Sequence, residues 1–189
     1  MPFLKWPGGK TRLLNEIAAR LPAGRRLVEP FAGSCAVSLA IDYDAYWLND
    51  INPDLINLYT ILTTEGPPFV DYCASLFVPE NNNSEAYYTL RDEFNTTSDR
   101  VRRAALFVYL NRHCFNGLVR YNREGEFNTP FGSYRAPYFP REEMLSFARR
   151  FKDALFTCLD FAGVIRQAEP GDVIYADPPY VPLSDTSDF

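Results

Sequence analysis

The fold of this chain is decided by residues 27–50, which read LVEPFAGSCAVSLAIDYDAYWLND. The stretch opens with the short apolar run Leu27-Val28 and then passes through a glycine-bearing turn. A helical pattern follows at 37–41, and a second short apolar run at 46–48 ends at Asn49-Asp50. This order of strand, turn, helix and strand predicts the beginning of a parallel α/β sheet.

Alternating helix and strand patterns are found on both sides of the central part of the chain, which has a different pattern. Before the first strand, residues 10–21 have the spacing of an amphipathic helix. Near the end of the chain, a helical pattern at 140–151 is followed by strand patterns at 154–158 and 172–176. We therefore expect one sheet to be built from both ends of the chain.

The central part is mostly helical. Four helices are predicted in it, at 54–63, 69–77, 84–95 and 99–113. Ser84 and Asp99 are the expected caps of the last two helices. The stretches Pro67-Pro68 and 81–83 are expected to separate helices.

A β-hairpin is predicted at 114–134, where polar and apolar residues alternate around Arg123-Glu124-Gly125. The economical organisation is an α/β domain formed by residues 1–54 and 146–189. A mostly helical insert at 55–145 would carry the hairpin.

Length and composition fit this plan. The chain has 189 residues, of which 47% are hydrophobic, enough for one domain or for one domain with an insert. It has no 18-residue apolar run and no signal-type start, which disfavours a membrane or secreted protein. The cysteines at 35, 73, 114 and 158 have no C-x-x-C spacing and are expected to be reduced and mostly buried. With His113 as the only histidine, histidine-based metal sites and Ser-His-Asp chemistry are nearly excluded.

The distribution of charge is more informative than its total. The net charge of −5 argues weakly against a nucleic-acid partner, yet residues 100–123 contain six arginines and no acidic residue. A surface that faces phosphates needs local positive charge only. For Arg102 and Arg103, the alternative of ordinary solvated helix faces remains open.

The turn after the first strand is a candidate nucleoside site. In doubly wound sheets, the crevice between a strand end and the next helix binds nucleoside-containing cofactors. Asp50 ends the following strand, 17 residues after Gly33, where an acid can accept both ribose hydroxyls of an adenosine. The alternative is an ordinary turn at a strand end.

The PGGKT stretch at 7–11 lacks the spacing of a phosphate loop, but its glycines allow close backbone approach and Lys10 could meet a carboxylate.

The run DVIYADPPY at 172–180 points to methyl transfer to a planar exocyclic amine. The Asp177 carboxylate and the Pro178 carbonyl can accept the two N–H groups of such an amine and localise its lone pair. Tyr180 can stack on the ring, and the two prolines fix the loop. Catalysis would then consist of positioning and of neutralising a sulfonium, with no strongly shifted base.

Residues 111–122 combine arginine, amides and aromatics, the types that read base edges and wedge between stacked bases. A hairpin that only packs against helices is the alternative reading.

Together these stretches resemble the Dam-type DNA adenine-N6 methyltransferases over the whole chain. Four ordered motifs carry the resemblance: FLKWPGGK at 3–10, EPFAG at 29–33, the recognition hairpin within 111–132, and DPPY at 177–180. The resemblance implies a Rossmann-like, S-adenosylmethionine-dependent methyltransferase sheet with a target-recognition insert. It also implies a cytoplasmic, nucleoid-associated protein encoded by a bacterium or phage. Its usual target is the duplex sequence GATC.

The resemblance also implies roles for individual residues. The cofactor would be held by Trp6, Lys10, Phe31, Gly33, Asp50 and Asp177. The catalytic residues would be Asp177, Pro178 and Tyr180, with the target adenine flipped into a pocket bounded by Tyr180. Duplex DNA would be contacted by Lys5, Phe115, Asn116, Leu118, Arg120, Asn128 and Pro130. Of these, Phe115 matches the aromatic that fills the vacated stack, and Arg120 is suited to a bidentate contact with guanine.

The chain departs from the family pattern in two places. Cys35 stands where the cofactor loop usually has its second glycine, and we expect its side chain to crowd the methionine part of the cofactor. Family members continue beyond the catalytic strand, so the sheet is expected to be incomplete there. Strand 172–176 would be an exposed edge with uncovered apolar faces, through which two chains could associate.

Two alternative functions follow from these observations. One is a truncated, inactive remnant that binds DNA or a partner without catalysis. The other keeps the chemistry and changes the substrate, because related motifs serve RNA adenine, cytosine-N4 and glutamine-amide methylation. The Asp at 177 and the hairpin favour adenine in duplex DNA.

Overall fold

Residues 1–179 are described by the structure, a computed structural model. Their four strands form one parallel sheet in the order β3-β2-β1-β4. The strands are β1 (Arg26–Glu29), β2 (Ala45–Asn49), β3 (Leu155–Thr157) and β4 (Asp172–Ile174). The predicted sheet built from both ends of the chain is therefore confirmed.

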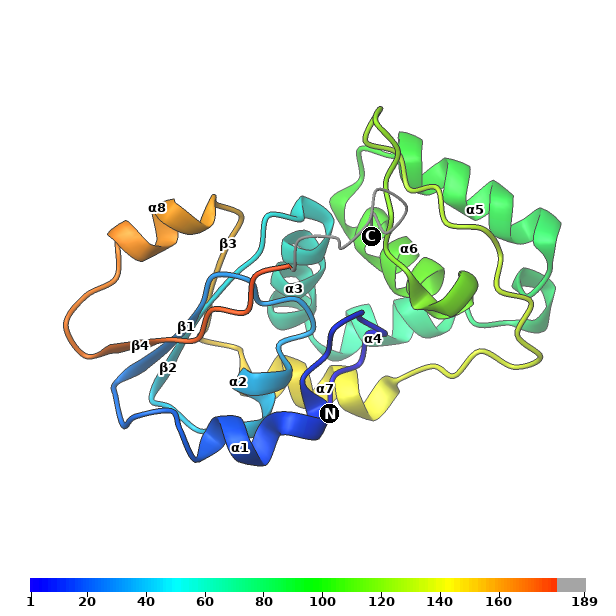
Figure 1. Cartoon of the computed structure of the whole chain (residues 1–189). Helices are drawn as coiled ribbons and strands as arrows, with labels where there is room; N and C mark the ends of the chain where they lie inside the picture. Colours follow the sequence, from blue (N-terminus) through cyan, green and yellow to red (C-terminus); the bar gives the residue numbers. More distant parts are fainter. Residues whose placement is uncertain (180–189) are drawn as a thin grey trace.

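The two faces of the sheet are covered by different helices (Figure 1). Successive residues of β1 point to opposite faces. Leu27 packs with Val37 of α2 (Ala36–Ala40) and with Val173, next to side chains of α1 (Leu14–Ala18). Val28 packs with Trp47 and with Val164 of α8 (Phe161–Arg166) on the other face. The sequence patterns did not predict α8.

The central part of the chain folds into helices that pack around α6. The helices are α3 (Pro53–Glu65), α4 (Pro67–Ala74), α5 (Ser84–Thr96) and α6 (Arg100–His113), and α7 (Arg141–Arg150) follows the hairpin segment. Helix α6 contacts α3, α4 and α5, and every residue from 104 to 111 is buried. Short 3₁₀ turns lie at Thr11–Leu13, Pro79–Asn81 and Phe115–Gly117.

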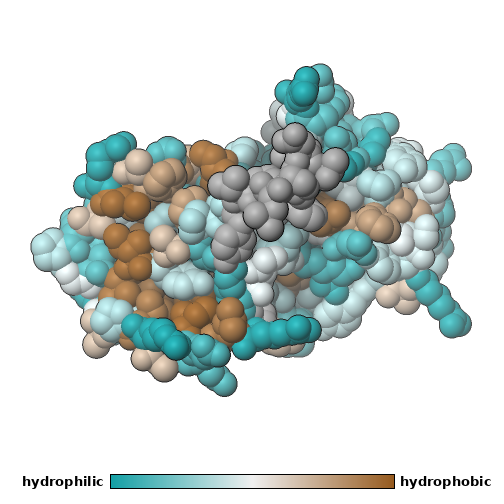
Figure 2. All heavy atoms as spheres, in the orientation of Figure 1, coloured by the Kyte–Doolittle hydropathy of each residue, from teal (hydrophilic) through white to brown (hydrophobic). Residues whose placement is uncertain are grey.

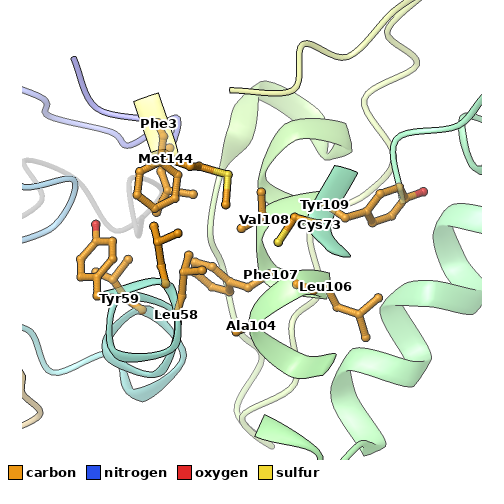
Figure 3. Packing of buried hydrophobic residues seen from close by; sticks show 14 of the residues in the cluster. Phe3, Leu58, Tyr59, Cys73, Ala104, Leu106, Phe107, Val108, Tyr109 and Met144 are labelled. Atoms are coloured by element: carbon orange, nitrogen blue, oxygen red, sulfur yellow. The ribbon is translucent and has the colours of Figure 1, made fainter. Parts of the chain in front are cut away.

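One hydrophobic core joins the helices to the sheet. Phe3 of the N-terminal segment lies beside Met144 of α7 and packs edge-on against Tyr59 of α3 (Figure 3). The same cluster contains Leu48 of β2 and Phe107 of α6. The N-terminal segment is thus held between the sheet and the helices that were predicted as an insert.

Three expected details of the helices were wrong. Asn83, rather than Ser84, caps α5 by accepting the N–H of Ala86 at 2.9 Å. Pro67-Pro68 begins α4 instead of separating helices, since proline is tolerated in the first helical turn. The helix predicted at 10–21 is a 3₁₀ turn followed by the five-residue α1. By contrast, Asp99 caps α6 as predicted.

The predicted hairpin is present in irregular form. Tyr121 and Phe127 form an antiparallel bridge, and Cys114 and Phe131 form a second one. The chain turns at Gly125, whose φ is 79°. Between the bridges the pairing is loose, which distinguishes this segment from two regular strands.

Strand β4 lies at one edge of the described sheet, and one of its faces is uncovered. Ile174 of β4 is 39% exposed, and Phe161 and Ile165 of α8 are half-exposed. Figure 2 shows apolar surface concentrated on the half of the molecule that contains the sheet. Val173, on the other face, is buried, so the expectation that both faces are uncovered was wrong. Within residues 1–179, none of the helices combines the length and apolar character needed to cross a membrane.

Candidate functional site

The loop after β1 is shaped by close contact with Trp6. Gly33 has a φ of 46°, and a Cβ added there would lie 2.8 Å from the indole Nε1. A larger residue would therefore displace the indole and strain the backbone. The Gly33 carbonyl accepts the hydroxyl of the buried Tyr59 at 2.5 Å, which fixes the loop from the core side.

Asp50 joins this loop to the end of β2. Its Oδ2 accepts the N–H of Gly33 and its Oδ1 accepts the N–H of Asn52, both at 2.9 Å. Burial raises the pKa of Asp50, and these backbone hydrogen bonds oppose the rise. Each carboxylate oxygen has a second lone pair, so the side chain can still accept hydrogen bonds from a ligand.

Cys35 is turned away from the open side of the loop. Its side chain is fully buried in the main core cluster, and the residue adopts a left-handed φ of 55°. The thiol therefore lies in the core, and the expectation that it crowds the methionine part of the cofactor stays a prediction. Having cysteine rather than the usual glycine at this position makes the backbone conformation unfavourable, because left-handed conformations are unfavourable for residues with a Cβ.

Glu29, at the end of β1, is a buried carboxyl group beside this loop. Its Oε1 accepts the Ser38 N–H at 2.9 Å and the Ser38 hydroxyl. Burial raises the pKa of Glu29 to about 7, and the charge of Asp177 acts in the same direction. Glu29 thus ties α2 to the carboxyl end of the sheet.

The predicted catalytic motif begins at the same edge of the sheet. Lys10 forms an ion pair with Asp177, with Nζ 2.9 Å from Oδ2, and donates to the Gly8 carbonyl at 3.1 Å. The suggestion that Lys10 could meet a carboxylate is thereby confirmed. Pro178 follows Asp177, whereas Tyr180 lies outside the described residues.

An open apolar pocket of about 380 Å³ adjoins the motif. Phe31 lines it together with Phe161, and the two rings are 5.4 Å apart. Ile165 and the backbone stretch that contains Pro178 complete the pocket. The pocket therefore places Phe31, from the loop after β1, close to Pro178 of the predicted catalytic motif.

Asn111, at the end of α6, fastens the N-terminal segment beside the start of the predicted hairpin at 114–134. The Asn111 side chain accepts the Lys5 N–H at 2.9 Å and donates to the Lys5 carbonyl at 2.7 Å. Gly117 allows this crossing, because a Cβ there would lie 2.4 Å from the Lys5 Cβ. The Lys5 ammonium lies 4.0 Å from the centre of the Tyr134 ring. The structure thus brings Lys5 to both ends of the predicted hairpin, at Gly117 and Tyr134.

Arg120 and Asn128 are paired across the hairpin. The Arg120 Nε donates to the Asn128 Oδ1 at 2.8 Å, while the Asn128 N–H donates to the Arg120 carbonyl at 3.0 Å. The guanidinium is exposed, and part of it remains available for a ligand.

The remaining expected DNA-contacting residues lie on the same segment. Phe115 is 51% exposed, which is unusual for a phenylalanine. Asn116 has a left-handed φ of 54°, and its N–H donates to the Tyr134 hydroxyl at 3.0 Å. Leu118 is half-buried and Pro130 is exposed.

The arginines at 100–123 do not form one surface. Arg102 makes a two-pronged ion pair with Glu93, with both N–O distances at 2.7 Å, and Arg103 pairs with Asp54. Arg112 donates to the Tyr138 carbonyl. These three have partners within the protein, and Arg102 and Arg103 lie half-buried in ion pairs rather than on the solvated helix faces of the alternative.

His113 and three of the four cysteines are buried in the described part of the chain. His113 stacks on Tyr109, and burial lowers its pKa to about 4. Cys35, Cys73 and Cys114 are buried, while Cys158 is exposed. No cluster of three or more potential metal ligands is found among the described residues.

Comparison with known proteins identifies the family. The model of the D12 class N6 adenine-specific DNA methyltransferases matches residues 6–189, and the chain belongs to this family. This membership decides against the RNA, cytosine-N4 and glutamine-amide alternatives.

Three relatives carry the same name. The chain is 54% identical over 187 residues to the DNA adenine methylase of Serratia marcescens, covering 99% of this chain and 69% of the relative. It is 51% identical to the DNA adenine methylase of Salmonella typhi and 50% identical to that of Escherichia coli K12. Both of those alignments cover 99% of this chain and 67% of the relative. The chain is thus a Dam-type adenine-specific DNA methyltransferase, and such an enzyme needs a methyl donor and duplex DNA.

Sequence reasoning missed several residues at this site. Glu29 was treated only as part of the loop motif, although an acid at the end of a buried strand signals a perturbed carboxyl group. Phe161 was missed with α8, whose only signal is the cap Asp160 before a short apolar run. The partners Tyr59 and Tyr121 come from distant parts of the sequence and give no local signal.

Proposed function

We propose that this chain transfers a methyl group from S-adenosylmethionine to N6 of adenine in duplex DNA, within the sequence GATC and with the adenine flipped out of the helix. The observation that carries the proposal is the ion pair between Lys10 and Asp177. It joins the N-terminal motif to the catalytic motif at the edge where Gly33 and Asp50 also lie.

The residues of this edge fit the proposed cofactor. The Asp50 carboxylate suits ribose hydroxyls, and the indole of Trp6 leaves room at Gly33 only for a residue without a Cβ. Phe31 offers a flat apolar surface in a pocket of about 380 Å³. Lys10, beside Asp177, completes the set that the family resemblance assigns to cofactor binding.

The mechanism assigns two acceptors to the target amine. When bound, the cofactor supplies an electrophilic methyl group on a sulfonium. The Asp177 carboxylate and the Pro178 carbonyl hold the two N6 hydrogens of adenine, so that the nitrogen lone pair points out of the ring plane. After transfer, Asp177 or water takes the proton of the resulting ammonium. Positioning and charge neutralisation supply the rate acceleration. The stacking role proposed for Tyr180 lies outside the described residues.

The recognition segment supports duplex DNA as the substrate. Phe115 is exposed where an aromatic ring can enter the space left by a flipped base. Arg120, paired with Asn128, is suited to a bidentate contact with guanine. Lys5, Asn116, Leu118 and Pro130 are proposed to contact the DNA around it. We therefore propose that residues 55–145 form the recognition insert and that residues 1–54 and 146–189 form the catalytic part.

The alternative of an inactive remnant that only binds DNA is not favoured. The family match extends through the catalytic motif at 177–180. The ion pair of Asp177 with Lys10 also supports a site that is assembled for chemistry.

The test is transfer of labelled methyl groups from S-adenosylmethionine to a GATC duplex. The comparison duplex has the same sequence with its adenines already N6-methylated. We expect labelling of the first duplex only, and equal labelling of both would overturn the proposal. Asp177→Ala should abolish transfer, whereas the control Asp153→Ala, at an exposed carboxylate, should retain it.

Sequence choice is tested with a matched pair of arginines on one hairpin. Arg120→Ala should relax discrimination at one base pair by about 1–3 kcal/mol, the usual value of a bidentate contact. Arg123→Ala, also exposed, should leave discrimination unchanged. If Arg120→Ala preserved the preference for GATC, the role assigned to Arg120 would be wrong.

A further inference from the structure

A buried carboxylate connects the recognition hairpin to the helix that begins beside Asp50. Asp54, in the first turn of α3, is 6% exposed. Its Oδ2 accepts the hydroxyl of Tyr121 at 2.7 Å, and its two oxygens accept Arg103 at 2.5 and 3.1 Å. A hydroxyl held by a buried ionic pair has a fixed position, because leaving either charge unpaired is costly.

The other end of this connection reaches the proposed cofactor site. The Asn52 side chain caps α3 by accepting the N–H of Asp54 at 3.0 Å. The Asn52 N–H, in turn, donates to Asp50 at 2.9 Å. Asp50, Asn52, Asp54 and Tyr121 therefore form one continuous hydrogen-bonded chain.

Tyr121 is directly connected to the base-reading part of the hairpin. It follows Arg120 in sequence and bridges Phe127, whose ring it meets edge-on at 5.9 Å. Asn128, next to Phe127, holds the Arg120 guanidinium. A displacement of Tyr121 would therefore move the Arg120–Asn128 pair.

A second tyrosine holds the hairpin without reaching the cofactor site. Tyr87 of α5 is fully buried, and its hydroxyl donates to the Thr129 carbonyl at 2.8 Å. The two tyrosines thus fasten the two sides of the hairpin through single hydroxyl groups. Only Tyr121 is bonded to the start of α3.

We propose that Tyr121 is a positioning residue which, through Asp54, sets the hairpin relative to Asp50, so that cofactor and DNA strengthen each other's binding. The inference rests on the proposed function, in which Asp50 binds the cofactor and Arg120 reads a base. A ligand held by Asp50 favours one position of Asn52 and of the first turn of α3. That position in turn favours the position of Arg120 in which its guanidinium contacts a base. Coupling of this kind is reciprocal, so each ligand raises the affinity for the other by the same factor.

The experiment measures this factor in the full chain. The dissociation constant of S-adenosylhomocysteine is determined with and without a saturating GATC duplex, and the ratio of the two constants is the coupling. For the wild-type chain we expect a ratio in the range of about 5 to 150, typical of coupled sites. Tyr121→Phe removes only the hydroxyl and should bring the ratio close to one, while S-adenosylhomocysteine still binds alone.

Tyr87→Phe is the matched control, since it also removes one buried hydroxyl that fastens the hairpin. It should keep the wild-type ratio even if it weakens DNA binding. The inference is overturned if Tyr121→Phe keeps the wild-type ratio, if Tyr87→Phe lowers it equally, or if the wild-type ratio is one. These outcomes differ from failure of the proposed function, in which the wild-type chain transfers no methyl group to GATC.

Discussion

At the scale of the residue, Cys35 combines an unfavourable backbone conformation with a side chain that is well buried in the core. Its φ of 55° lies in the left-handed region, and its thiol is fully buried. In most positions alanine is more stabilising than glycine. Here we expect the opposite order, with Cys35→Gly more stable than Cys35→Ala by about 1 kcal/mol, because only glycine adopts this φ without strain.

The comparison of these two variants removes the contribution of the sulfur atom, which both lack. Denaturant unfolding of both chains gives the difference in the free energy of unfolding. A Cys35→Ala variant at least as stable as Cys35→Gly would show that the backbone at this position is unstrained.

Glu29 should make stability depend on pH. Burial raises its pKa from 4.5 to about 7, so the folded state holds the proton more tightly than the unfolded state. The contribution of this group is complete below pH 4.5 and is lost as the pH rises through 7. The side chain of the Glu29→Gln variant cannot ionise. The free energy of unfolding of the variant, relative to that of the wild type, should therefore increase as the pH rises across this interval.

Unfolding of both chains at several pH values checks this prediction. His113, with its pKa lowered to about 4, acts in the opposite direction between about pH 4 and 6.5, but it is present in both chains and cancels. A constant difference between the two chains would show that Glu29 ionises normally in the folded state.

Single residues differed in how far the sequence could predict them. The partner of Lys10 could be anticipated as a carboxylate, because the glycines before it allow close approach. The partners of Arg102 and Arg103 could not, because Glu93 and Asp54 come from other helices. Charge runs show where charge occurs in sequence but not which charges are already paired.

At the scale of the element, periodicity predicted the sheet and the long helices. Strands β1, β2 and β4 formed where short apolar runs predicted them. Helices α3, α5 and α6 formed where helical patterns of ten or more residues predicted them. Short helices were poorly predicted, as α1 and α8 have five and six residues and owe their form to packing on the sheet.

The hairpin shows a different limit of prediction. Its turn at Gly125 is a local signal and was placed correctly. Its two sides are bonded to Tyr87 and to Asp54, which come from separate helices and give no local signal. Of the proposed site, the loop and the motifs were therefore predictable, whereas the contacts that fasten them together were not.

At the scale of the whole molecule, the division into a catalytic part and an insert remains a proposal. The main core runs without interruption from Leu48 of β2 to Phe107 of α6. A shared core of this kind favours parts that move little relative to each other.

The uncovered face of β4 leads to a prediction about assembly. We propose that two chains associate through this edge, where Ile174 is exposed. Sedimentation should then give a mass that rises with concentration. Ile174→Lys places a charge on this face and should give a monomer at every concentration, while Ile51→Lys, at an exposed site away from β4, should not. A wild-type chain that stays monomeric would contradict the proposal.

The attachment of Lys5 to Asn111 has a consequence for synthesis on the ribosome. The two residues are 106 positions apart, so the start of the chain cannot reach its binding partner until α6 has been made. At about 5–20 residues per second, this delay lasts roughly 5–20 s. During that time Phe3 and Leu4, which are buried in the finished protein, remain exposed on the nascent chain. The segment that contains Lys5 and Lys10 is therefore made well before its partner Asn111, and chaperones can bind it in the interval.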